Sequence, residues 1–573
     1  MIHIPHKNTN ILLLSGLITM VLFNSRVFGQ AKPYNEEITV IAAFDPIIPD
    51  AFKINQNPVL TDTTTTIPTM TYSVIPRNAV IKLDIDPLPA VKLVAEPLSK
   101  IYRNYLKAGI GNYASLYGEL YASSLRSKTS LIGVHFKHLS YAGKIKDYGP
   151  SANSSQLAEV FGQQYFDNHT LSGKLFFNRE GLHLYGFKPA DYPNDVIDKK
   201  DIKQHYLVSG AEVSFGSRYK SDDKLDHTFG ISYYHLTDNY KVKENNVLFS
   251  ANLSKQADLF KWDSKQTLGL NTSLNFLNQS DSIHKINATV LCFNPTISAR
   301  INEYSFKAGL LFYVGIDSVT KAHLYPMLEA NIDLIPGSLQ LYAGIDGGME
   351  RNSIRSLSEE NPYITSGLPL RYTYNKFRAY GGFNSNISRS FNFNGSISST
   401  TFENYPFFVT DYSFFLNNTF TLLYDDISVV KIKAELEFVK AEKLRLSLAG
   451  HYYIYNMGDQ EYAWYKPDYD LDLTTTYNFQ DKIIFKFQAG FNGPVWAPVI
   501  YGYPDDKTSL LQQVYQGQKL KGWVDVNLGA EYKFNKALSF WLNINNLGST
   551  QHFNWYNYPS YRINVLGGLS YSF

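Results

Sequence analysis

The side chains that could do chemistry in this chain of 573 residues are its 13 histidines and a few paired charges. Histidine beside serine or aspartate can act as a general base in hydrolysis. The chain contains no phosphate-binding Walker loop, GxSxG elbow, HExxH motif or EF-hand loop, however. A lone histidine on a strand is more often structural than catalytic, so we expect no enzyme. The strand histidines considered are His135, His138, His183, His205 and His235.

Metal and redox chemistry find equally little support. Cys292 is the only cysteine, which excludes an internal disulfide and a CxxC metal site. Asp505 and Asp506 beside Lys507 could bind a cation, but solvated loop charge is the simpler interpretation. We therefore expect no cofactor and no metal. The net charge of +2 also argues against nucleic acid as a partner.

The elements that must carry these side chains are strands. Aromatic residues make up 15% of the chain, with 43 tyrosines and 37 phenylalanines, and aromatics favour strands. The mean hydropathy of -0.23 is too low for a helical membrane protein, because each spanning helix needs about 20 apolar residues. A membrane strand needs an apolar residue only at every second position.

The first hundred residues differ from the rest. Residues 1–29 carry a basic start and an apolar run, Ile11–Phe23, which predicts a secretory signal peptide cleaved after Gly29. An uncleaved anchor helix is the alternative, but the run is short for a span. Residues 30–100 hold nine of the chain's 24 prolines, at 33, 46, 49, 58, 68, 76, 87, 89 and 97. Proline favours extended chain, so we expect an extended periplasmic or lumenal segment.

Residues 101–573 repeat one pattern, in which strands of alternating polarity are separated by turns. In one example, Val430, Ile432, Ala434, Leu436 and Phe438 form an apolar face opposite Lys431, Lys433, Glu435 and Glu437. The alternation is typical of a transmembrane β-barrel, apolar outside and polar inside. A soluble β-sandwich is the alternative, but no second domain interrupts the pattern. We predict an all-β antiparallel barrel of about 22 strands, within a range of roughly 16 to 24.

The order of turns and loops predicts which connections face outward. Counting from either end of the chain assigns long outer loops to residues 141–167, 189–202, 348–372, 456–466, 493–520 and 549–560. The two counts collide between residues 388 and 445, so one strand there is misplaced. Loop 493–520 is rich in proline and aromatic residues, which suit recognition of a sugar or protein surface. Its candidate recognition residues are Trp496, Tyr501 and Tyr503, and a self-packed loop over the barrel mouth is the alternative.

The last strand ends in Gly568-x-x-Tyr571-x-Phe573, with an apolar face that includes Leu569. This ending resembles the C-terminal signal that the barrel-assembly machinery recognises. The polar residue usually found two positions before the glycine is Leu566 here, which departs from the pattern. The resemblance implies an outer-membrane barrel of a Gram-negative bacterium.

The last 50 residues resemble the end of a TonB-dependent receptor barrel, with the strand Leu538–Asn546, Tyr558-Pro559 and Arg562 before the final strand. Residues 30–100 are too few for the globular plug of such receptors, so the chain resembles a plug-less form. One short stretch, Glu37, Ile38, Thr39, Val40, Ile41 and Ala42, is similar to a TonB box, which pairs with an energy-coupling protein by β-addition. An ordinary extended segment is the alternative.

The resemblance and the pattern together predict transport across the outer membrane, passive or receptor-like, of an unknown solute. A structural, assembly or secretion role within a membrane complex is the alternative. The expected partners are outer-membrane lipid and the barrel-assembly machinery, together with TonB or a surface lipoprotein.

Overall fold

The computed structural model describes residues 102–124, 127–193, 197–198, 200–219, 223–260, 265–281, 285–500 and 515–573. The predicted signal peptide, the proline-rich segment 30–100 and the stretch Glu37–Ala42 lie outside the described residues. Tyr501, Tyr503 and the charges at Asp505–Lys507 lie outside them as well.

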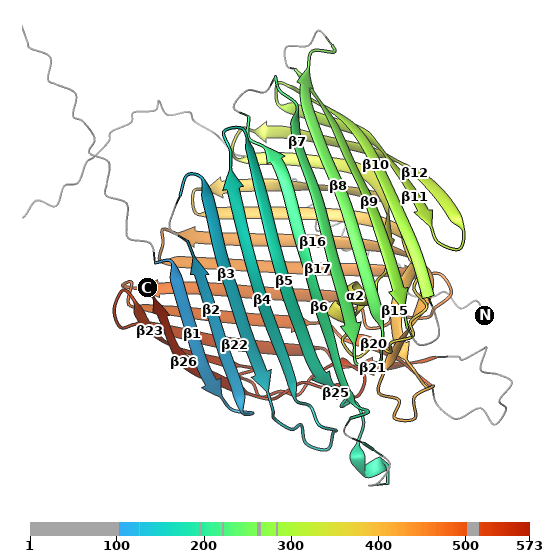
Figure 1. Ribbon diagram of the computed structural model, residues 1–573, viewed down its shortest axis with the longest axis vertical. Coiled ribbons are helices and arrows are strands. Elements are labelled where there is room, and N and C mark those ends of the chain that lie inside the picture. Colours follow the sequence, from blue (N-terminus) through green and yellow to red (C-terminus); the bar gives the residue numbers. More distant parts are fainter. Residues whose placement is uncertain are drawn as a thin grey trace, which may run out of the picture. The chain divides into compact units, whose positions relative to one another are not determined.

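One antiparallel sheet of 22 strands makes up the described chain, and it closes because β1 pairs with β26 (Figure 1). This confirms the predicted fold class and strand number. The strands of its first half are β1 (Asn104–Gly111), β2 (Ser115–Ser123), β3 (Ser130–Tyr141), β4 (Asn153–Tyr165), β5 (His169–His183), β6 (Lys203–Ser217), β7 (Asp226–Asp238), β8 (Lys243–Ala257), β9 (Gln266–Ser280), β10 (Lys285–Ile301) and β11 (Tyr304–Ile316). Those of its second half are β12 (Thr320–Ile335), β13 (Leu339–Arg351), β14 (Tyr372–Ser388), β15 (Phe391–Thr410), β16 (Phe420–Lys440), β17 (Leu444–Met457), β18 (Tyr469–Phe479), β19 (Ile483–Asn492), β22 (Trp523–Lys533), β23 (Leu538–Asn545) and β26 (Asn564–Ser572).

The remaining elements lie in the connections. Two small hairpins pair β20 (Val495–Val499) with β21 (Gln516–Leu520) and β24 (Phe553–Trp555) with β25 (Tyr558–Pro559). A short α-helix, α2 (Ile354–Glu360), and a 3-10 turn, η1 (Pro189–Asp191), complete the described chain. Neither has the length that a helix needs to cross a membrane, and no other described helix does.

The alternation read from the sequence assigns the two faces of the barrel wall correctly. Large apolar side chains on one parity of each strand are exposed to the outside, as membrane strands require. Examples are Ile132, Leu175, Val213, Leu324, Ile397, Leu528, Phe540 and Tyr571. On the other parity, Lys433 pairs with Glu435 at 2.7 Å, and Glu437 pairs with Arg445 on the next strand at 2.6 Å. Charge pairing within the lumen therefore explains the polar face of β16.

The two ends of the barrel differ in their connections. At the end that holds Tyr102 and Phe573, neighbouring strands are joined by connections as short as the two residues 302–303 and 389–390. At the opposite end, the connections reach 19 residues or more, as in 184–202, 352–371 and 493–522. Bacterial barrels have short periplasmic turns and long extracellular loops, so the long connections form the extracellular mouth.

The predicted outer loops lie at this mouth, with one correction. Residues 141–167 are not a single loop, because they contain the whole of β4. Its outward positions include Ser154, Gln156 and Gly162, so its apolar alternation is too weak to be read as a strand. The conflict at residues 388–445 has a different cause. β15 and β16 have 20 and 21 residues, about twice the length that crosses a membrane, and continue into the extracellular mouth.

A row of charges crosses five neighbouring strands on the lumen wall. His135 on β3 lies 3.1 Å from Glu119 on β2 and 3.5 Å from Glu159 on β4. Lys174 on β5 lies 3.9 Å from Glu159 and 3.1 Å from Glu212 on β6. His135 is thus a member of this row, and its neighbours are carboxylates rather than a serine nucleophile.

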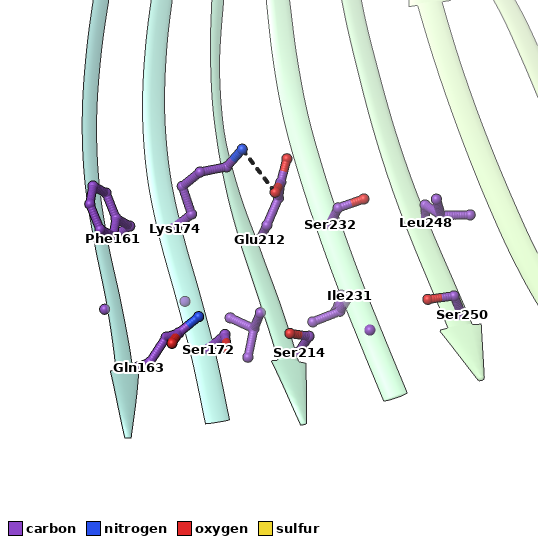
Figure 2. A pocket seen from close by; sticks show the side chains of 14 residues that line it. Phe161, Gln163, Ser172, Lys174, Glu212, Ser214, Ile231, Ser232, Leu248 and Ser250 are labelled. Atoms are coloured by element: carbon purple, nitrogen blue, oxygen red, sulfur yellow. Dashed lines mark ion pairs between the residues drawn. The ribbon is translucent and has the colours of Figure 1, made fainter. Parts of the chain in front are cut away.

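Small side chains hollow the lumen wall beside this row. A shallow pocket of about 420 Å³ runs from β4 to β8, and half of its lining residues are glycine or serine, including Gly173, Gly230 and Ser232. Figure 2 shows Lys174 and Glu212, two of the residues that line the pocket, reaching toward each other. The wall is therefore polar, with its fixed charges already paired.

The closing seam between β1 and β26 is built around glycine. Gly109 and Gly568 stand directly opposite each other, and the buried ring of Trp541 from β23 lies over Gly109 on the lumen side. The ammonium of Lys107 is 4.4 Å from the centre of the Trp541 ring, a cation–π contact. A Cβ at position 568 would overlap the carbonyl oxygen of Ala108, so the close approach of the two strands requires glycine.

Candidate functional site at the closed mouth

The extracellular loops fold inward and pack on one another. Residues 184–202, 352–371, 411–419, 458–468, 493–522 and 546–563 contribute their described parts to this structure, which we call the loop cap. Its core is apolar and aromatic, and it joins side chains from β6 and β7 to side chains from β15, β16 and β20. In a ring of 22 strands, β6 and β16 are nearly opposite, so the cap spans the mouth.

The centre of the cap is the inward loop, residues 352–371, which connects β13 to β14 and carries α2 (Figure 1). Ser353 begins the helix as its N-cap. The side chain of Ser353 accepts a hydrogen bond from the amide of Ser356 at 3.0 Å, and the Ser356 hydroxyl accepts one from the amide of Ser353 at 3.1 Å. On the helix itself, Ile354 and Leu357 are buried in the cap core. Local capping and an apolar face therefore give this loop a defined structure.

Glu244 at the start of β8 fastens the inward loop to the barrel wall. Its carboxylate accepts hydrogen bonds from the amides of Ile354 at 2.7 Å and Arg355 at 3.3 Å, the first two residues of α2. The hydroxyl of Tyr234 donates a third at 2.9 Å. Glu244 is 0% exposed, and a buried carboxylate needs such donors. Since α2 follows β13 and β8 stands five strands away, this contact places the loop across the lumen rather than above its own strands.

Further hydrogen bonds hold the loop to β6 and β7. The hydroxyl of Tyr206 donates to the carbonyl of Pro362 at 3.1 Å. Ser366 donates to the carboxylate of Asp238, which also accepts from the side chain of Gln204 at 3.1 Å. The wall therefore holds the inward loop along its length.

On the opposite side, Lys466 of connection 458–468 holds the end of α2. Its ammonium lies 2.6 Å from the carboxylate of Glu360, the last residue of the helix. Burial lowers the pKa of Lys466, but the nearby Tyr405 hydroxyl and Glu360 carboxylate outweigh this effect and the pKa lies above its usual value. A cation at the C-terminal end of a helix also favours the helix dipole. α2 is therefore held at both ends, from β8 and from the connection after β17.

Tyr558 on β25 joins four connections of the cap. Its ring stacks on Tyr363 of the inward loop, with centroids 3.7 Å apart, and meets Tyr185 edge-on at 4.8 Å. Its hydroxyl donates to the carbonyl of Asn418, whose side-chain amide donates to the carbonyl of Leu184 at 2.7 Å. Burial raises the pKa of Tyr558 well above its usual value, so this hydroxyl stays a donor.

Asp425 on β16 organises the connection after β17. Its carboxylate accepts hydrogen bonds from the amides of Asp459 at 2.9 Å and Gln460 at 3.0 Å. The turn so formed presents Trp464, which is 1% exposed and donates from its ring nitrogen to the side chain of Gln460 at 3.1 Å. Fully burying a large aromatic side chain contributes about 3 kcal/mol. Side chains of the cap are thus packed as in a protein interior.

A lumen-facing cavity of about 550 Å³ lies directly beneath the inward loop. The wall strands β3 to β6 line one side of it, and Arg355, Glu359 and Tyr363 of the inward loop line the other. Glu180 on the wall side accepts a hydrogen bond from Ser155 at 2.6 Å. The guanidinium of Arg355 lies over the Tyr234 ring at 4.7 Å. The cavity is polar with aromatic edges, and the inward loop forms the side of it that faces the wall strands.

The site residues predicted from the sequence fall in separate places. Tyr571 and Phe573 are exposed on the lipid side of β26, and Gly568 lies in the seam. Trp496 stacks on Tyr462 inside the loop cap, with centroids 4.2 Å apart. Recognition by its loop stays a prediction.

The residues that close the mouth were not singled out from the sequence. Glu244, Lys466 and Tyr558 occupy ordinary strand or loop positions. Their partners Ile354, Glu360 and Asn418 lie 110, 106 and 140 residues away along the chain. An acidic residue at the end of a strand is a common pattern. The sequence alone therefore does not identify Glu244 as the residue that holds the inward loop. Only the proline and aromatic content of loop 493–520 pointed toward the cap.

No family model matches the chain, and no curated protein does either. Solved structures do match. The FrpB iron transporter from Neisseria meningitidis, F3-3 variant, has a TM-score of 0.61 at 11% identity and covers 83% of this chain and 82% of its own. The siderophore receptor PirA from Acinetobacter baumannii has a TM-score of 0.61 at 10% identity, with 82% and 80% covered. The pyoverdine outer membrane receptor FpvA from Pseudomonas aeruginosa PAO1, bound to pyoverdine, has a TM-score of 0.58 at 13% identity, with 82% and 78% covered.

At these identities the likeness is one of fold, and it agrees with the resemblance to TonB-dependent receptors in the last strands. The closed ring of strands and its apolar outer face indicate the same location. The chain is a 22-stranded β-barrel of the cell outer membrane that shares its fold with iron and siderophore receptors.

Proposed function

We propose that this protein is a receptor-type transport barrel whose extracellular mouth is closed by its own inward loop, so that a solute passes only when that loop moves. The observation that carries the proposal is the attachment of α2 at both ends, to Glu244 on β8 and to Lys466 beyond β17. The cavity beneath the loop offers polar and aromatic side chains to a solute. The matched structures, which are receptors and an iron transporter, support the same class of function.

A passive, permanently open pore fits these observations less well. The lumen of a barrel of 22 strands is too wide for wall side chains to fill. A closed barrel of this size therefore needs a loop or another segment of the chain to block the lumen. The inward loop and the aromatic contacts around Tyr558 do this at the extracellular mouth.

The change Glu244→Ala tests the proposal. It leaves the first amides of α2 and the Tyr234 hydroxyl without their acceptor, which costs roughly 3 kcal/mol and corresponds to about a 100-fold rise in the open population. We expect rare or no current steps from the wild type in planar lipid bilayers and frequent steps from the variant.

Glu212→Gln is the matched control, because Glu212 is a lumen carboxylate that pairs with Lys174 and lies on the wall away from the inward loop. It should behave as the wild type does. If Glu244→Ala is as silent as the wild type while its loop becomes sensitive to added protease, the inward loop is not the barrier and the proposal fails.

Energy coupling through Glu37–Ala42 is a separate part of the proposal, supported by the sequence alone. An extended stretch of this type pairs with its partner by β-addition. We expect the full chain in detergent to bind the soluble periplasmic domain of a TonB protein in isothermal titration, and a chain lacking Glu37–Ala42 to lose that binding. Equal affinity for the two chains would remove the TonB box from the proposal but leave the closed mouth intact.

A second candidate is a platform for a partner in an outer-membrane complex. The observation in its favour is the dense packing of the loop cap, with Trp464 and Phe420 almost fully buried, which gives partners a rigid surface. A platform has no need of a movable loop. It predicts that neither the wild type nor any loosened variant conducts, so the same bilayer measurement distinguishes the two functions.

A further inference from the structure

A group of basic side chains lies on the outer surface of the barrel near its extracellular end. Arg179 on β5, Lys203 on β6 and Lys200 before it line a pocket of about 630 Å³, together with His183 and His205. The strand register fixes their direction. Gly181 is paired with His205 and His183 with Lys203, and these share the parity of the exposed residues Leu175 and Phe177. The four strand side chains therefore belong to the face that meets the membrane, not to the lumen, and Lys200 lines the same pocket.

The height of the pocket matches the edge of the membrane. Along β5, the outward residues Leu171, Leu175 and Phe177 are apolar and exposed, and Arg179 follows two positions later. Two strand residues cover about 7 Å, so Arg179 stands just above the apolar band. The polar headgroups of the outer leaflet occupy this level. The pocket therefore faces lipid headgroups on the extracellular side.

The charges of this pocket are not neutralised by the parts of the chain that the structure describes. Within those parts, the side-chain cations of Arg179, Lys200 and Lys203 form no ion pair with a carboxylate, in contrast to the paired charges of the lumen. The carboxylate of Asp198 accepts a hydrogen bond from the backbone amide of Lys200 at 2.9 Å. The side-chain contact of Arg179 is to the hydroxyl of Ser154 at 3.5 Å. His183 is oriented by the carbonyl of Ala152 at 2.7 Å, which leaves its other ring nitrogen available. Three cations that form no ion pair within the described chain, at a lipid boundary, favour an anionic ligand.

We propose that Arg179, Lys200 and Lys203, with His183 and His205, bind the phosphorylated headgroup of a glycolipid in the outer leaflet. A planar guanidinium binds phosphate oxygens through paired hydrogen bonds, and lysines add compact charges around it. The acyl chains of such a lipid would lie along Leu175 and Phe177, directly below. Apolar contact and charge thus point to one amphiphilic ligand.

The test is a titration of the full chain, purified in detergent and freed of lipid, with a bisphosphorylated diglucosamine glycolipid, followed by native mass spectrometry. The triple variant Arg179→Gln, Lys200→Gln, Lys203→Gln should bind on the order of 100-fold more weakly. A control variant with Lys431, Lys433 and Lys486 changed to glutamine removes the same charge from the lumen and should bind normally. Heat-dependent migration on gels shows that each variant retains its barrel.

Two further titrations show whether the protein recognises the phosphorylated glycolipid or phosphate alone. The dephosphorylated glycolipid should bind the wild type as weakly as the phosphorylated one binds the triple variant. Inorganic phosphate should compete only at far higher concentration than the lipid. Equal binding by the wild type and the triple variant, equal binding of both glycolipids, or phosphate competing as well as the lipid would each overturn the proposal.

Discussion

Replacing residues 353–370 with a short glycine-serine turn is expected to convert the closed barrel into a conducting pore. The 22-stranded wall should survive, because the ladder between β13 and β14 lies below the loop. The lumen is too wide for wall side chains to fill it. Steady current steps in planar bilayers, where the wild type is silent, are the measured outcome, and they should exceed the brief openings of Glu244→Ala.

Comparison with a second deletion shows whether the inward loop or the first hundred residues form the barrier to current. A second variant that lacks residues 31–100 but keeps the inward loop should remain as silent as the wild type if the mouth is the barrier. Current from that variant, together with silence from the loop deletion, would instead assign closure to the N-terminal segment and contradict the proposed role of the inward loop. Liposome swelling in sugars of increasing size would then measure the pore that each variant opens.

Gly568→Val is expected to prevent the barrel from closing. A Cβ at this position meets the backbone of Ala108 and the Cα of Gly109, 2.6 Å away, and backbone atoms cannot rotate aside. Forcing a larger residue into a packed site costs about 3 kcal/mol or more. The measured outcome is loss of the heat-dependent gel migration that marks a closed barrel, together with a fall in the amount of protein in the outer membrane.

Gly567→Val is the matched control, because a Cβ there meets only the Leu542 side chain at 3.3 Å and the Trp541 carbonyl oxygen at 3.4 Å. The valine side chain at position 567 would point to lipid, and the variant should be tolerated. Refolding into detergent, with no assembly machinery present, separates two roles of Gly568. Failure in detergent assigns the glycine to the seam, whereas normal refolding combined with failure in cells would assign it to the assembly signal and contradict the packing argument.

The class of fold and the strand number followed from the sequence because alternation is a local property. Each strand exposes one face to lipid and one to the lumen. The residue types of Val430 and Lys431 therefore assign them to the lipid face and the lumen face without information about the neighbouring strands. β4 was the exception. Its outward serine, glutamine and glycine residues weaken the apolar alternation, and pairing with β3 and β5 decides its place.

The positions of the long loops also followed from the sequence, but their structure did not. Loop 493–520 was recognised by its proline and aromatic content, and its tryptophan, Trp496, lies in the cap against Tyr462. That partner comes from the preceding extracellular connection. A loop's own composition cannot show which other loop it will meet.

The closed mouth, the glycine seam and the basic pocket were decided by the tertiary structure. Glu244 and Ile354 are 110 residues apart, and Lys466 and Glu360 are 106 apart. Each pair meets only because 22 strands close into a ring and bring distant connections to the same opening. Residue types and their period of two determine what faces lipid, whereas the circumference of the closed ring determines which loops meet across the lumen.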